Sequence, residues 1–210
     1  MKTNRVLIIA IIIAFTAQTS YSELSKESIY SELKKQYNGI NSIEFSFSSL
    51  ENPYFKGSIK AKTGDKYVIS MPGRDIICNG ETIWNVTTED NKTVISNFED
   101  TGEGSLSIEN LFFHFLDNYK PSRLVRENSS KGINRYVLTL VPDGSDNKFG
   151  DYKKIRLWLS INDFEIEKVE LTGDYEINTY VISNINRNRS IPADVFVFDP
   201  PEDMEIIDIR

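Results

Sequence analysis

Apolar and polar residues alternate with a period of two along most of the chain. Ile43, Phe45 and Phe47, for example, are separated by single polar residues. The same pattern recurs from segment 55–62 as far as "VFVF", residues 195–198, where two prolines end it. Alternation of this kind predicts half-buried strands, each with one apolar face and one solvated face.

Short turn signals separate these segments. Asn79-Gly80 is typical of a two-residue hairpin, and Gly64-Asp65, Asn162-Asp163 and Gly173-Asp174 are typical of tight turns. Many strands of similar length joined in this way predict a mainly β fold. We expect about ten or eleven strands in an incomplete, half-closed antiparallel barrel.

Two segments have helical spacing instead. Leu24, Ile29, Leu33 and Tyr37 share one face of a short helix that ends at Asn38-Gly39. The segment 105–119, "SLSIENLFFHFLDNY", predicts a second helix between strands. Such helices can cover one face of a curved sheet.

Residues 1–22 have the pattern of a secretory signal peptide. A basic start is followed by an apolar run over residues 6–15, and Ser20 and Ser22 supply the small residues of a cleavage site. A membrane anchor is the alternative, but the run is shorter than the ~20 residues that span a bilayer. We expect cleavage after Ser22, so that residues 23–210 form one exported domain.

The net charge restricts the classes of partner that the chain can bind, and the cysteine content shows whether disulfides can stabilise it. The chain has a net charge of -7, and without residues 1–22 it would carry 22 basic and 31 acidic residues, a net charge of -9. This excess argues against nucleic acid and anionic membrane surfaces as partners. Cys78 is the only cysteine, so the fold depends on packing without an internal disulfide.

Residues suited to catalysis are scarce. His114 is the only histidine, which excludes multi-histidine metal sites, and a structural role for it is favoured. Cys78 follows Ile76 and Ile77 and is interpreted as a small buried apolar residue. The acidic segment 143–151 lacks the spacing of a calcium-binding loop. We therefore predict no enzyme activity, no cofactor and no metal site.

Aromatic residues are the unusual feature that remains: 12 Phe, 10 Tyr and 2 Trp. They could fill an ordinary core, or they could line a cavity covered by the second helix. In the cavity interpretation the walls are Phe45, Phe47, Phe55, Ile59, Trp84 and Leu157, and the lid is Phe112, Phe113, Phe115 and Leu116. The pattern alone leaves both interpretations open.

Two stretches resemble a known family. Residues 55–86, "FKGSIKAKTGDKYVISMPGRDIICNGETIWNV", are similar to a pattern of the periplasmic outer-membrane lipoprotein carrier (LolA) family, with a glycine opening a strand and a hairpin that ends in Trp84. Residues 196–208, "FVFDPPEDMEIID", resemble that family's terminal motif. Phe55, Gly57, Ile59, Phe196 and Phe198 are the other matched positions, and the resemblance implies that a final strand at 195–198 closes the sheet.

The resemblance also implies a function. Members of that family are periplasmic and non-enzymatic, with helices as a lid over an apolar cavity. The cavity takes acyl chains of lipoproteins released by an inner-membrane ABC transporter and delivers them to an outer-membrane receptor. A monomer without nucleic-acid partners is expected. In place of the family arginine that tethers the lid, this chain has Lys62 and Thr63, and a lysine does not reproduce the planar hydrogen bonding of arginine.

Two alternatives stay open beside the carrier. The chain could be a lipid-binding or lipoprotein-binding sensor or regulatory module on the same fold, without transport. The other alternative is an exported enzyme that binds a cation through Asp143, Asp146 and Asp151. For the carrier, we expect the segment 112–115 to compete with the cargo for the cavity, because a site that realised the full burial energy would not release its ligand.

Overall fold

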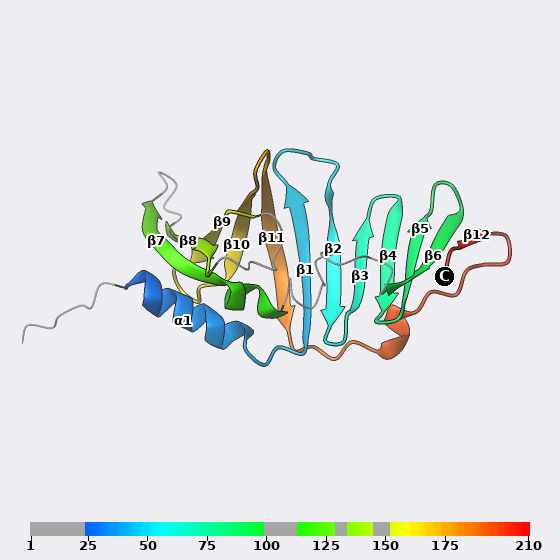
Figure 1. Cartoon of the computed structure of the whole chain (residues 1–210), viewed down its shortest axis with the longest axis horizontal. Helices are drawn as coiled ribbons and strands as arrows, with labels where there is room; N and C mark the ends of the chain where they lie inside the picture. Colours follow the sequence, from blue (N-terminus) through cyan, green and yellow to red (C-terminus); the bar gives the residue numbers. More distant parts are fainter. Residues whose placement is uncertain (1–23, 99–112, 129–133, 145–151) are drawn as a thin grey trace, which may run out of the picture.

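The computed structural model describes residues 24–98, 113–128, 134–144 and 152–210. Their twelve strands form one sheet in the order β12-β6-β5-β4-β3-β2-β1-β11-β10-β9-β8-β7. Figure 1 shows the sheet curving across the molecule, with helix α1 (Lys26–Tyr37) below the half that contains β7 to β11. The prediction of a mainly β fold is confirmed, and because β12 and β7 end the sheet without pairing to each other, it is open.

Two antiparallel meanders make up the sheet. The first contains β1 (Ser42–Ser49), β2 (Lys56–Lys62), β3 (Lys66–Met71), β4 (Arg74–Asn79), β5 (Thr82–Thr87) and β6 (Lys92–Asn97). The second contains β7 (Tyr119–Asn128), β8 (Asn134–Pro142), β9 (Lys154–Ser160), β10 (Ile166–Thr172) and β11 (Ile177–Arg187). They join where β1 pairs antiparallel with β11, so the first and last strands of the two meanders lie at the centre.

The hairpin between β4 and β5 forms where Asn79-Gly80 predicts it. The Asn79 side-chain oxygen accepts hydrogen bonds from the backbone N–H groups of Glu81 and Thr82 at 2.9 and 2.8 Å. Gly80 has a φ of +94°, and a Cβ there would lie 2.5 Å from the carbonyl oxygen of Gly64. Both the left-handed backbone and the close approach therefore require glycine.

The end of the chain corrects one prediction. Residues 195–198 are not a strand: Ala193–Phe196 is a 3₁₀ helix, η4. The alternation arises because this segment lies against the sheet, with Phe196 1% exposed and Val197 53% exposed. The last strand, β12 (Glu205–Asp208), follows the proline pair and pairs in parallel with β6, which raises the strand count to twelve.

The first predicted helix is confirmed as α1. Ser25 caps it by accepting a hydrogen bond from the Ser28 N–H, and Ile29, Leu33 and Tyr37 are buried. Of the second, residues 105–112 lie outside the described residues. Residues 113–118 form helical turns that include the 3₁₀ helix η3 (Phe115–Asn118), and the strand then begins at Tyr119, earlier than predicted. Among the described helices, none is long and apolar enough to cross a membrane.

Two hydrophobic clusters lie on opposite faces of the sheet. The larger one, on what we call the cavity face, contains α1 residues together with Ile43, Phe47 and Leu157. The smaller one, on the outer face, contains Ile77, Trp84, Val86 and Ile95, with Phe198 and Met204 of the C-terminal segment packed against it. The faces follow from the pleat, since Ile83 belongs to the larger cluster and its neighbour Trp84 to the smaller one.

Candidate functional site

A cavity of about 340 Å³ lies on the cavity face of the sheet. Its 18 lining residues come from α1, η3 and seven strands of both meanders, or from the residues just before them. All of them are aliphatic or aromatic, and none carries a charge. The volume is at the small end of the roughly 300–1,000 Å³ that is typical of ligand pockets.

The pleat places these side chains. On β1, Ile43, Phe45 and Phe47 face the cavity, and Ile182 of the paired strand β11 lies opposite Phe47. The β11 register shifts opposite the Glu44/Ser46 step of β1, and Asn184 there has a φ of +56°. This bulge turns Ile185 toward the cavity, although strict alternation from Ile182 would point it outward.

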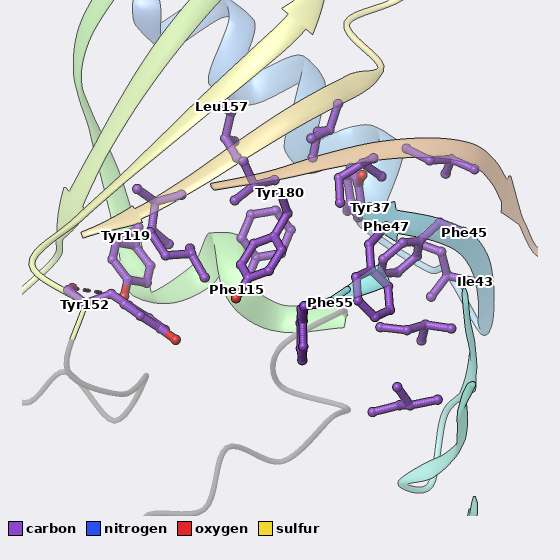
Figure 2. Close-up of a pocket in the computed structure, with 18 residues that line it drawn as sticks. Tyr37, Ile43, Phe45, Phe47, Phe55, Phe115, Tyr119, Tyr152, Leu157 and Tyr180 are labelled. Atoms are coloured by element: carbon purple, nitrogen blue, oxygen red, sulfur yellow. Dashed lines mark hydrogen bonds between the residues drawn. The ribbon is translucent and has the colours of Figure 1, made fainter. Parts of the chain in front are cut away.

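Aromatic rings meet along the wall. Phe55 has its ring centroid 5.6 Å from that of Phe47 and 6.1 Å from that of Tyr180. Tyr37 and Phe115 make an edge-to-face pair at 5.6 Å. Figure 2 shows Phe115 and Tyr180 reaching into the cavity, with Phe55 near them.

The tyrosine hydroxyls make hydrogen bonds at the wall. Tyr119 donates to the carbonyl oxygen of Tyr152 at 3.2 Å, and Tyr37 accepts from the Arg187 guanidinium at 3.4 Å. Burial raises the pKa of Tyr37, and burial raises the pKa of Tyr180 as well, so both phenols are neutral at ordinary pH. The wall therefore has no net charge.

Part of the predicted lid reaches the cavity. Phe115 lines it, while Phe113 and Leu116 are buried in the cluster on the same face. Phe112 lies outside the described residues. The lid interpretation is thus restricted, in the described chain, to the turns between residues 113 and 118.

Helix α1 holds these turns. The Lys34 ammonium lies 2.7 Å from an Asp117 carboxylate oxygen, and the one proton of the Tyr30 hydroxyl is shared between the carbonyl oxygens of Leu116 and Tyr119. The hydrogen bond from Lys34 lowers the pKa of Asp117, with a smaller contribution from His114. The sequence pattern pointed to neither α1 residue.

Lys62 and Thr63, the predicted tether position, lie at the end of β2. Lys62 pairs with Ser42 and Lys66 across the sheet, and the Thr63 N–H donates to the carbonyl oxygen of Asn41. The structure records no hydrogen bond or ion pair between either residue and the described turns at 113–118. Neither residue lines the cavity.

The structure brings five of the six predicted wall residues together: Phe45, Phe47, Phe55, Ile59 and Leu157. Trp84 is the exception and is corrected here, because its position in β5 places it in the cluster on the outer face. The lining residues that the prediction missed include Tyr37, Tyr180 and Ile182. Period two marks Tyr180 and Ile182 as facing one side of a strand, but it cannot show that β11 lies beside β1.

Other candidate groups lie away from the cavity. His114 is half exposed, with its Nδ1 3.6 Å from an Asp117 carboxylate oxygen. Asp143 pairs with Lys120 at 3.1 Å, and Asp146 and Asp151 lie outside the described residues. Cys78 is fully buried, as expected, and burial raises the pKa of its thiol. Within the part of the chain that the structure describes, no three acidic, histidine or cysteine residues gather as metal ligands.

Fold and site together define a class of protein: an open, mainly antiparallel sheet around an uncharged apolar cavity. The fold is similar to that of an uncharacterized conserved protein from Thermus thermophilus, with a TM-score of 0.52 and 12% identity over 88% of this chain and 99% of that one. At this identity the similarity shows the fold alone.

Other solved structures with a similar arrangement include a LolA superfamily protein from Nitrosomonas europaea, with a TM-score of 0.39 and 14% identity over 84% of this chain and 99% of that one. Another is lipoprotein LppX from Mycobacterium tuberculosis, with a TM-score of 0.47 and 14% identity over 81% of this chain and 100% of that one. No protein-family model and no curated protein sequence matches the chain.

Proposed function

We propose that this protein binds acyl chains in the cavity and carries them through the periplasm. The observation that carries the proposal is the uncharged lining of the cavity. Each methylene moved from water to such a wall contributes ~0.8 kcal/mol. An exposed acyl chain therefore has a strong drive to enter, whereas a charged ligand finds no opposite charge among the lining residues.

The cargo in this proposal is the acylated end of a lipoprotein. An inner-membrane ABC transporter would release the lipoprotein to the carrier, and an outer-membrane receptor would accept it. The leader-like pattern of residues 1–22 supports export, and the acidic chain has no feature that suits nucleic acid. No chemistry is assigned to the protein: it acts as a monomeric binding protein without a cofactor.

Release requires that the empty cavity have its own stable state. Phe115 supplies a side chain that can occupy space an acyl chain would use, since it lines the cavity and packs on Tyr37. Closure by such a side chain competes with the ligand and lowers the net affinity. Phe112, which we also assign to this lid, remains a sequence-based expectation.

The first test uses neighbouring residues on opposite faces of β11. Ile182 lines the cavity, whereas Val181 is 37% exposed on the outer face. We expect Ile182→Asp to weaken binding of a fluorescent fatty-acyl probe by about 100-fold, because a carboxylate beside an acyl chain is poorly solvated. Val181→Asp is the matched control and should leave the affinity within about twofold of wild type.

Titration of the probe into the purified protein measures both variants. Equal affinities for the two variants and wild type would contradict acyl binding in this cavity. A second assay then asks whether acylated lipoprotein, taken up from spheroplasts, passes to outer-membrane vesicles. Transfer supports a carrier, while binding without transfer supports a sensor on the same fold.

A further inference from the structure

Exposed apolar side chains gather at one end of the sheet. The described residues include twelve large hydrophobic side chains that are strongly exposed, and five of them lie in two neighbouring connections or at the start of the strand that follows one of them. We call these five the rim: Leu50, Tyr54, Phe55, Tyr175 and Ile177. Tyr54 is 86% exposed and Tyr175 is fully exposed, so nothing in the described chain covers them.

The two connections lie side by side. The first joins β1 to β2, and the second is the hairpin from β10 to β11, as Figure 1 shows at the top of the sheet. The Leu50 N–H donates to the carbonyl oxygen of Thr179 at 2.9 Å, and the Glu51 carboxylate accepts from the Thr179 N–H at 2.9 Å. These bonds join the loop to β11, so the two connections that carry the rim are held beside each other.

Phe55 connects the rim to the cavity. It is 41% exposed and yet lines the cavity, where its ring meets those of Phe47 and Tyr180. The cavity therefore opens to solvent beside this ring. Phe55 thus belongs both to the rim and to the cavity wall.

The charged groups next to the rim indicate which surface charge its partner has. Glu51 is hydrogen-bonded within the chain, and Asp174 is paired with Lys153. Glu176 adds a further negative charge, whereas Lys56 is the basic residue next to Phe55. The rim thus has no excess of positive charge, and an anionic surface gains nothing from it.

From this surface we propose that the rim docks on the interface of a net-neutral, zwitterionic bilayer, and that an acyl chain enters the cavity past Phe55. The inference deepens the proposed function and rests on it. Tyrosine suits such a position because its ring is apolar and its hydroxyl remains hydrated at the headgroup level. Loop tips can enter a fluid interface without the matching surface that a protein partner must supply.

The test compares two double variants of the exported protein. Tyr54→Ser with Tyr175→Ser removes the most exposed rim rings, which contribute little to packing. Val197→Ser with Ile209→Ser removes exposed apolar side chains, 53% and 61% exposed, from the C-terminal segment. Mass spectrometry and circular dichroism establish that wild type and variants have the same processed mass and fold.

Cosedimentation with phosphatidylcholine vesicles is measured beside solution binding of the fatty-acyl probe. We expect the rim variant to bind vesicles at least about tenfold more weakly than wild type and to bind the free probe within about twofold of wild type. The C-terminal variant should match wild type in both. Added phosphatidylglycerol should not strengthen wild-type binding.

The other outcomes separate the two proposals. A wild type that binds the probe but ignores phosphatidylcholine overturns the bilayer inference and leaves the rim a surface for a protein partner, with acyl binding intact. Binding that needs phosphatidylglycerol and disappears with salt also overturns it, as does equal vesicle binding by both variants. Failure to bind the probe would instead remove the proposed function.

Discussion

The Lys34–Asp117 ion pair joins α1 to the turns that carry Phe115. The pKa of Asp117 is lowered from 3.8, mainly by the hydrogen bond from Lys34. A carboxyl group whose pKa is lower in the folded state stabilises that state above its unfolded pKa. The stabilisation is lost as the pH falls from 3.8, the pKa of the unfolded state, through the lower pKa of Asp117 in the folded state.

We expect Asp117→Asn to lower the free energy of unfolding at neutral pH by about 0.2–1 kcal/mol, because the pair is half exposed and solvent screens it. Urea unfolding of wild type and variant at a series of pH values measures the difference. It should shrink toward zero as the acid limit is reached, since wild-type Asp117 is then protonated too. A difference that stays constant down to the acid limit would mean that the variant perturbs packing and not the ion pair.

The sheet face on which a side chain lies was predictable where the alternation within one strand decides it. Phe45, Phe47 and Ile59 alternate clearly and line the cavity. Lys34 gave no signal, because its partner Asp117 is distant in the sequence and a lysine on a helix is ordinarily solvated. Trp84 alternates as well, but the pattern does not say which face of β5 the cavity occupies.

The C-terminal segment acts as a strap over the sheet. Helix η4 packs on β3 and β4, and Phe198 and Met204 cover the cluster around Trp84 before β12 pairs with β6. Phe196 is 1% exposed, whereas its neighbour Val197 is 53% exposed. Substitutions at these two neighbouring residues therefore distinguish the contribution of the buried side chain from that of an exposed one beside it.

Phe196→Ala should destabilise the protein by about 3–5 kcal/mol, because it removes a fully buried ring and leaves a cavity. Val197→Ala should stay within about 0.5 kcal/mol of wild type. Chemical denaturation measured by the fluorescence of Trp84 and Trp158 provides both values. If the two variants were equally stable, Phe196 would not anchor the segment.

The predicted strand at residues 195–198 was wrong because a strand and a segment that packs on a sheet can have the same alternating sequence pattern. A segment lying flat on a sheet alternates between buried and exposed side chains just as a strand does, and residues 195–198 are such a segment. Only the hydrogen-bond partners distinguish the two, and those are supplied by β6 to residues 205–208 instead. The hairpin at Asn79-Gly80 was predictable because local backbone conformation decides it.

At the scale of the whole molecule, Cys78 reports on the integrity of the sheet. It is fully buried in β4, and burial raises the pKa of its thiol, so the reactive thiolate is scarce in the folded state. We expect a thiol reagent to label wild type only as fast as the protein unfolds. Labelling should therefore follow the urea unfolding transition.

The matched control is Cys78→Ala combined with Tyr175→Cys, which places a thiol at a fully exposed position. This protein should be labelled at once in the absence of urea. Fast labelling of wild type in native conditions would instead show that the sheet opens locally near β4, independently of global unfolding.

The sequence by itself determined the class of fold, the first helix and five of the 18 residues that line the cavity, because alternation, helical spacing and turn chemistry are local properties. Tertiary structure decided which faces enclose the cavity, that β11 lies beside β1, and that Lys34 and Tyr30 hold the turns next to it. It also brought the β1–β2 and β10–β11 connections, which carry the rim, side by side (Figure 1). These features depend on contacts between residues far apart in the chain, and no local pattern specifies them.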